Sequence, residues 1–97
     1  MVKDPKYQFF DFEFEFNKAG YRMLENNQVE GAIGVFELTA SFFPESANAW
    51  DSLAEAYWRA GDTAKAEELY NKAISMDPDG DVGANARRML VEMKKGE

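Results

Sequence analysis

A spacing of 34 residues organises most of this 97-residue chain. Pro44 and Pro78 stand 34 positions apart, and each follows an apolar run that is typical of a helix. Shifting the sequence against itself by this offset pairs residues of similar character, such as aromatic with aromatic. The matched pairs are Phe16/Trp50, Ala19/Leu53, Gly20/Ala54, Met23/Tyr57, Ala32/Ala66, Phe36/Tyr70 and Pro44/Pro78. A fixed period of this length indicates a repeat protein, whose small structural units stack on one another.

The second unit, residues 47–80, has the pattern of two packed helices. Trp50, Leu53 and Tyr57 follow one another at i, i+3 and i+7, which places them on one face of a helix. Small side chains then allow a second, antiparallel helix to approach closely; they are Ala54, Ala66 and Ala73. We therefore expect a helical hairpin here, and a weaker copy of it in residues 13–46.

Turn residues mark the ends of these helices. Gly61 suits the left-handed backbone that follows a helix C-terminus, and Asp62 can cap the N-terminus of the next helix. Pro78 disfavours helical geometry at Asp77 and so ends the second helix. In the first unit Asn27 takes the place of Gly61, and asparagine is the next-best residue for that turn.

The same residues resemble the tetratricopeptide repeat over two units, residues 13–46 and 47–80. The resemblance implies an all-α fold in which antiparallel helix pairs stack into a superhelix. It also implies a module that binds other proteins without catalysing a reaction. The residues that carry it are Trp50, Leu53, Ala54 and Tyr57, then Ala66, Tyr70, Ala73 and Pro78, with Ala54 standing where the family most often has glycine.

A last helix is expected over residues 81–95, but it does not continue the repeat. The repeat register would put Ala84, Arg87, Arg88 and Val91 on its packed face, whereas the apolar residues are Ala86, Met89, Leu90 and Met93. The segment therefore resembles the polar-backed capping helix that ends such arrays. We predict one domain over residues 1–97, with five helices at about 11–26, 29–43, 47–60, 63–76 and 81–95.

The stretch FFDFEFEF, residues 9–16, has the two-residue alternation of a half-buried strand. Because Phe16 pairs with Trp50 in the 34-residue register, we expect a helix instead. One face would then run from Phe9, Phe12 and Phe16 through Ala19, Gly20 and Met23. Phe10 and Phe14 fall on a second face, for which three partners are open: an N-terminal arm (residues 5–8), a second copy of the chain, or an upstream domain.

Composition excludes several classes of function. The net charge of −7 argues against a nucleic-acid partner, because such domains usually carry a basic stripe. The chain has no cysteine and no histidine, which removes thiolate metal sites and the usual general base. No apolar run approaches the roughly 18 residues of a membrane span. We therefore expect no catalytic residue, no cofactor and no membrane partner. Because the N-terminus lacks the apolar core of a signal peptide, the cytoplasm is the default compartment.

Asp77, Asp79 and Asp81 have the opening spacing of a calcium-binding EF-hand loop. The match then fails, because Val82 stands where glycine is needed and Arg88 where the bidentate glutamate belongs. We therefore interpret this segment as an acidic turn and a helix cap, and expect no metal site.

The predicted binding surface is the groove lined by the first helix of each unit, where partners of such arrays lie. Mixed aromatic and polar side chains suit an extended or helical peptide. For Leu24 and Trp58 an equal alternative is packing on the next helix. Two carboxylates in this groove would repel a third, which argues against a clamp for a C-terminal carboxylate. The groove residues are Phe14, Asn17, Tyr21 and Leu24 from the first unit, and Asn48, Asp51, Glu55 and Trp58 from the second.

Two other expectations concern how the chain is used. Because about three units are normally needed for stability, exposed aromatics at Phe10, Phe14 or Trp58 could form a homodimer surface. Residues 20–62 also resemble the repeat pair appended to bacterial serine hydrolases of the β-lactamase and penicillin-binding type, above all in FPESANAWDSLAEAY. That resemblance implies an accessory module of a larger protein, periplasmic if the parent is exported. No activity carries over, because the motifs of the catalytic domain are not in this chain.

Overall fold

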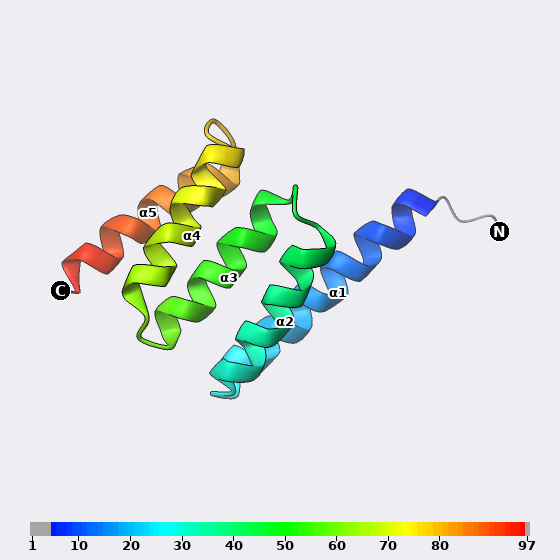
Figure 1. Ribbon diagram of the computed structural model, residues 1–97, viewed down its shortest axis with the longest axis horizontal. Coiled ribbons are helices and arrows are strands. Elements are labelled where there is room, and N and C mark those ends of the chain that lie inside the picture. Colours follow the sequence, from blue (N-terminus) through cyan, green and yellow to red (C-terminus); the bar gives the residue numbers. More distant parts are fainter. Residues whose placement is uncertain (1–4, 97) are drawn as a thin grey trace.

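The computed structural model describes residues 5–96, and the side chains of residues 12–96. It consists of five α-helices: α1 (Pro5–Glu25), α2 (Val29–Phe42), α3 (Ala47–Arg59), α4 (Thr63–Met76) and α5 (Asp81–Lys95). Successive helices pack side by side and antiparallel, so that the chain forms an elongated row from α1 to α5 (Figure 1). The described residues contain no strand, and the prediction of an all-α helical repeat is confirmed.

Helix α1 begins at Pro5, two turns earlier than the predicted start near residue 11. Proline is well suited to the first position of a helix, because its φ angle is fixed near the helical value and its missing N–H would have no partner there. α1 therefore projects well beyond the end of α2 (Figure 1). The backbone of residues 5–8 belongs to this helix, so the idea that these residues fold back as a separate arm is wrong. The side chains of Phe9 and Phe10 lie outside the described residues.

Within each helix pair, a turn of the same kind joins the first helix to the second. Asn27 and Gly61 both have positive φ, at 63° and 90°, as the register predicts. In the first turn the N–H of Gln28 donates to the carbonyl of Met23 at 2.8 Å. In the second turn the N–H of Asp62 donates to the carbonyl of Tyr57 at 2.9 Å. Residues 34 positions apart thus make the same turn.

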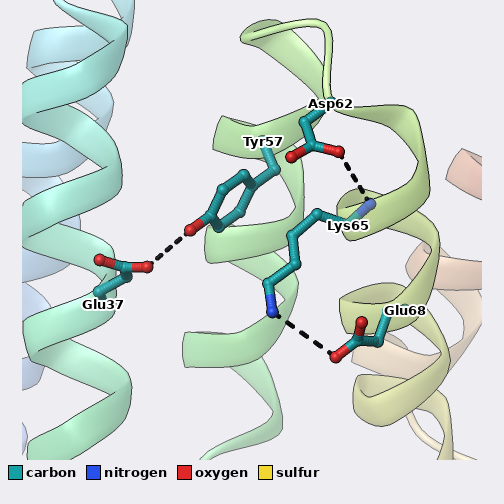
Figure 2. Close-up of polar contacts among 5 residues, drawn as sticks. All are labelled: Glu37, Tyr57, Asp62, Lys65 and Glu68. Carbon is teal, nitrogen blue, oxygen red and sulfur yellow. Dashed lines mark hydrogen bonds and ion pairs between the residues drawn. The ribbon is translucent and has the colours of Figure 1, made fainter.

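Polar side chains cap the helices and join neighbouring ones. Asp62 Oδ1 accepts the backbone N–H of Lys65 at 3.1 Å and caps α4, as predicted. Figure 2 shows this cap beside the ion pair of Lys65 with Glu68, at 3.6 Å. In the same view Tyr57 of α3 reaches across to α2, where its hydroxyl donates to Glu37 Oε2 at 2.6 Å. This contact connects the second helix of the first pair to the first helix of the second pair.

The core depends on small residues opposite large rings. Phe36 and Tyr70 are fully buried, one in each helix pair. A Cβ placed on Gly20 would lie 2.5 Å from the ring of Phe36, so only glycine lets α1 and α2 approach this closely. In the second pair Ala54 stands at the matching position and is also fully buried.

Helix α5 packs by the face that its own apolar residues define. Ala86 and Met93 are buried, and Met89 and Leu90 are partly buried against the core. The residues that the repeat register would place inside are all exposed: Ala84, Arg87, Arg88 and Val91. α5 contacts α4 and α3, so it closes the second pair without repeating it.

Candidate functional site

The first helices of the two pairs and the last helix, α1, α3 and α5, share one polar face. α3 contacts α1 on one side and α5 on the other. We call this the α1/α3/α5 face and define it by the polar residues whose hydrogen bonds link the three helices: Asn17, Tyr21, Asp51, Ser52, Glu55 and Asn85.

Tyr21 and Ser52 connect α1 to α3. The Tyr21 hydroxyl lies 3.0 Å from Glu55 Oε1 and 3.2 Å from Ser52 Oγ, and it can donate its one proton to either. Ser52 Oγ in turn donates to Asn17 Oδ1 at 2.8 Å. The ring of Tyr21 packs edge-on against Phe36, with centroids 5.1 Å apart, so core packing fixes its position. Burial is the main cause that raises the pKa of the Tyr21 phenol, and the charge of Glu55 adds to it.

Asp51 connects α3 to α5. The amide nitrogen of Asn85 donates to both carboxylate oxygens of Asp51, at 3.1 and 3.3 Å. Arg88 Nη2 donates to Asn85 Oδ1 at 2.6 Å and so fixes the orientation of this amide. The pKa of Asp51 is raised to about 6, mainly by burial and also by the charge of Glu55, while the hydrogen bond from Asn85 and the charge of Arg88 oppose the rise. This carboxylate therefore titrates close to neutral pH.

The fully buried Tyr70 of α4 lies behind these carboxylates. Its hydroxyl oxygen has no hydrogen-bond partner among the described residues. Burial raises the pKa of Tyr70 strongly, and the negative charges of Asp51 and Glu55 raise it further. The face therefore holds two carboxylates and the phenol of Tyr21, with the buried phenol of Tyr70 behind them.

The structure brings four of the predicted groove residues together on this face: Asn17, Tyr21, Asp51 and Glu55. Phe14 and Asn48 lie at its edge, where they line a recess of about 310 Å³ with Glu13, Asn17 and Ser46. Ser46 Oγ donates to Glu13 at the rim of this recess.

Leu24 is 1% exposed and belongs to the hydrophobic core, so its predicted place in the groove is corrected. The reason is that the last turn of α3 lies against the end of α1, where Arg59 Nη2 donates to the carbonyl of Leu24 at 3.4 Å. Trp58 is half-buried and packs against the same core, so it offers only part of its ring to a ligand.

The prediction missed Ser52, Tyr70 and Asn85. The repeat register carried a signal for Asn85, because Asn17, Asp51 and Asn85 follow one another at 34-residue steps. This signal was not used, because the apolar face of residues 81–95 does not follow the register. Ser52 and Tyr70 had no such signal, since their roles depend on where the helices meet.

A second surface lies on another face of the N-terminal half of α1, where aromatic rings meet the end of α2. Phe12 stacks on Phe16 at 6.4 Å, and Phe16 stacks on Phe42 at 6.3 Å. These rings and Phe43 line an open apolar recess of about 280 Å³. Phe12 is 57% exposed and Phe42 is 61% exposed. We call these four phenylalanines the aromatic end.

The acidic turn before α5 has a structural role. Asp77 Oδ2 accepts the N–H of Val82 at 3.1 Å and caps the helix. In the part of the chain that the structure describes, no three Asp or Glu side chains are grouped as a metal site. Among the same residues, no helix is long and apolar enough to cross a membrane.

Comparison with known proteins gives two results. The family model of the tetratricopeptide repeat matches residues 17–81, more than half of the chain. Superkiller protein 3 of Schizosaccharomyces pombe is 32% identical over 68 residues, which cover 70% of this chain. The chain spans only 5% of the length of that relative.

Proposed function

We propose a binding function from one premise: this chain belongs to the tetratricopeptide repeat family, whose members are interaction scaffolds and generally not enzymes. The proposed function is to bind a segment of another protein along the α1/α3/α5 face. The observation that carries it is the polar network of that face, which spans three helices and holds amides, carboxylates and a phenol beside a recess that Phe14 lines. Proteins usually recognise peptides through such mixtures of apolar surface and fixed polar groups.

The structure supports a pre-formed site. Tyr21 and Ser52 are held by bonds between α1 and α3, and Asp51 is held by Asn85. A ligand that meets groups already fixed in place loses less conformational entropy on binding. Phe14, which is 61% exposed, and Asn48 remain accessible beside this fixed network.

A selection from a phage-displayed library of random 12-residue peptides tests the proposal. We expect peptides that bind the wild-type chain, and weaker binding by about tenfold for Phe14→Ala or Asn48→Ala, measured by fluorescence polarisation. Phe42→Ala is the matched control, because Phe42 is as exposed as Phe14 but lies at the aromatic end. Failure to select any peptide, or equal losses for Phe14→Ala and Phe42→Ala, would contradict the proposal.

The aromatic end favours a second candidate function, self-association. Its exposed rings and open recess present apolar surface of the kind that forms interfaces. The first turn of α1 contains no acidic residue, whereas Glu13 and Glu15 follow two turns later. An antiparallel pairing of two α1 helices would set the N-terminus of each helix dipole near the acidic stretch of the other. A second copy of the chain is therefore the proposed partner of this end.

Light scattering coupled to size-exclusion chromatography tests self-association. We expect a dimer at micromolar concentration that Phe12→Asp or Phe42→Asp converts to a monomer with unchanged helicity. A wild-type monomer over the same concentration range would rule out this second function and leave peptide binding untouched.

We also propose that the module serves a larger protein, as the resemblance to the repeat pair of bacterial serine hydrolases implies. The relative found is a fungal protein, and it neither supports nor opposes that narrower origin. The reading frame around this chain tests the idea, since a serine-hydrolase domain encoded upstream of Met1 would support it. A different neighbouring domain would exclude the hydrolase but not the accessory role.

A further inference from the structure

The fully buried hydroxyl of Tyr70 is the starting point. It has no partner among the described residues, and leaving a buried polar group unpaired costs about 1–3 kcal/mol. The matching residue of the first helix pair is Phe36, which needs no partner. The hydroxyl lies within the electrostatic reach of Asp51, Glu55 and Tyr21. A polar group thus lies beneath the α1/α3/α5 face without a hydrogen bond.

The two carboxylates above Tyr70 lack a direct cationic partner. Asp51 and Glu55 are on the same helix, four residues apart, so their negative charges repel each other. Among the described residues neither forms an ion pair. Arg88 acts on Asp51 only through its charge, while it donates to Asn85, and Arg59 donates to the carbonyl of Leu24.

We infer that this face holds a binding site for one ammonium or guanidinium group, formed by the carboxylates of Asp51 and Glu55 and the phenol of Tyr21, with the buried hydroxyl of Tyr70 behind them. The occupant is a lysine or arginine side chain of the bound protein segment. The inference rests on the proposed function and adds the chemical class of one side chain of the partner.

Each group has a separate role in such a site. Glu55 uses Oε1 toward Tyr21, which leaves Oε2 to accept a hydrogen bond from the ligand. Asp51 is fixed by Asn85 and is 7% exposed, so it contributes mainly its charge. The phenol oxygens provide neutral dipoles at the base of the site, and Tyr70 is held rigidly by its burial. A cation bound here would favour the ionised form of Asp51.

The peptide selection described above also tests this inference, and the two failures differ. We expect the selected peptides to share a lysine or arginine at one position. Binders without such a basic position would overturn the cation site and leave peptide binding intact. An absence of binders would instead overturn the proposed function.

Substitution of single groups gives the second test. A selected peptide should lose about tenfold or more in affinity when its shared basic residue becomes norleucine. Asp51→Asn and Glu55→Gln should lower its affinity for the wild-type peptide by about tenfold each, but not its affinity for the norleucine peptide. Glu68→Gln is the control, since it removes one carboxylate from an exposed position on α4. Equal losses for both peptides, or for the control variant, would overturn the site.

Tyr70→Phe removes only the hydroxyl and keeps the packed ring. We expect it to weaken the basic peptide about threefold to tenfold and to leave the norleucine peptide unchanged. Circular dichroism verifies that each variant keeps its helical content. Unchanged affinity of Tyr70→Phe for the basic peptide would remove the phenol from the site.

Discussion

The first and second helix pairs have the same backbone plan but bury different chemistry. In both pairs the two helices are joined by a left-handed turn with the same hydrogen bond, at Asn27 and Gly61. Beneath its inner face the first pair buries the ring of Phe36 against Gly20, with no polar group on that ring. The second pair buries Tyr70 with its hydroxyl unpaired, below Asp51.

The contacts that stabilise the fold are shared by the two pairs, whereas the groups that distinguish ligands are not. The apolar contacts that the two pairs share determine the repeat geometry, which the 34-residue register records. The polar groups that only the second pair has are costly to bury, and they are the groups that can tell one ligand from another. The following predictions test this comparison, from the largest expected effect to the smallest.

Truncating the two central rings should have the largest effect, and a similar one in both pairs. We expect Phe36→Ala and Tyr70→Ala each to lower the free energy of unfolding by about 3–5 kcal/mol, because both rings are fully buried. Trp50→Ala should cost less, since Trp50 is half-buried and its Nε1–H donates to the carbonyl of Pro44 near the surface. Urea unfolding followed by circular dichroism measures all three.

Clearly unequal losses for Phe36→Ala and Tyr70→Ala would contradict the equivalence of the two pairs. Phe42→Ala is the control, because its ring is 61% exposed and its truncation should change the free energy of unfolding little.

Substitutions at Gly20 and Ala54, the small residues where the helices of each pair meet, should affect the two pairs differently. Gly20→Ala would place a Cβ 2.5 Å from the buried ring of Phe36, which also packs against the ring of Tyr21. We expect it to lower stability by about 1–3 kcal/mol despite the better helix propensity of alanine. Ala54→Gly in the second pair should cost about 1–2 kcal/mol, the sum of the lower helix propensity of glycine and the loss of one buried methyl group, with no steric clash.

Thermal unfolding of the two variants gives the comparison. A Gly20→Ala chain as stable as the wild type would show that the first pair can open to the spacing of the second. A Gly31→Ala variant serves as a control, because its Cβ would meet only the flexible end of Met23, at 3.2 Å.

The sequence predicted the helices better than their ends. The pairing of Phe16 with Trp50 was enough to choose helix over strand for residues 9–16. Trp50 lies in a segment with a clear helical pattern, and the 34-residue register assigns the same structure to Phe16. The start of α1 was missed because Pro5 precedes the first repeat and no register covers it. Here a local preference of proline, rather than the repeat, determines the boundary.

The candidate site was only partly predictable for a related reason. Helical spacing alone selects the face that carries Asn17, Tyr21, Asp51 and Glu55, so these residues were found. It cannot tell where that face becomes covered, and Leu24 is covered because the end of α3 crosses it. The surroundings of the Tyr70 hydroxyl are formed by residues from three helices, so residue spacing cannot predict that it has no hydrogen-bond partner.

The smallest expected effect concerns the charge of Asp51, and it occurs only in the second pair. Burial raises the pKa of this carboxyl from 3.8 to about 6 in the folded chain. The folded state therefore holds the proton more tightly than the unfolded state, so this residue contributes stability below pH 4 that is lost as the pH rises through 6. The groups that act on it are Glu55 of its own helix and, from α5, Asn85 and Arg88.

Asp51→Asn removes this titration with little change in shape. We expect its stability relative to wild type to rise between pH 4 and pH 7, by on the order of 1 kcal/mol, because water near the carboxylate weakens the full effect. Urea unfolding at pH 4, 5, 6 and 7 measures the difference. Asn17, which stands at the matching position of the first pair, carries no charge, so an Asn17→Ala chain should keep the wild-type pH dependence. If the two variants followed the same pH profile, the charge of Asp51 would not distinguish the second pair from the first.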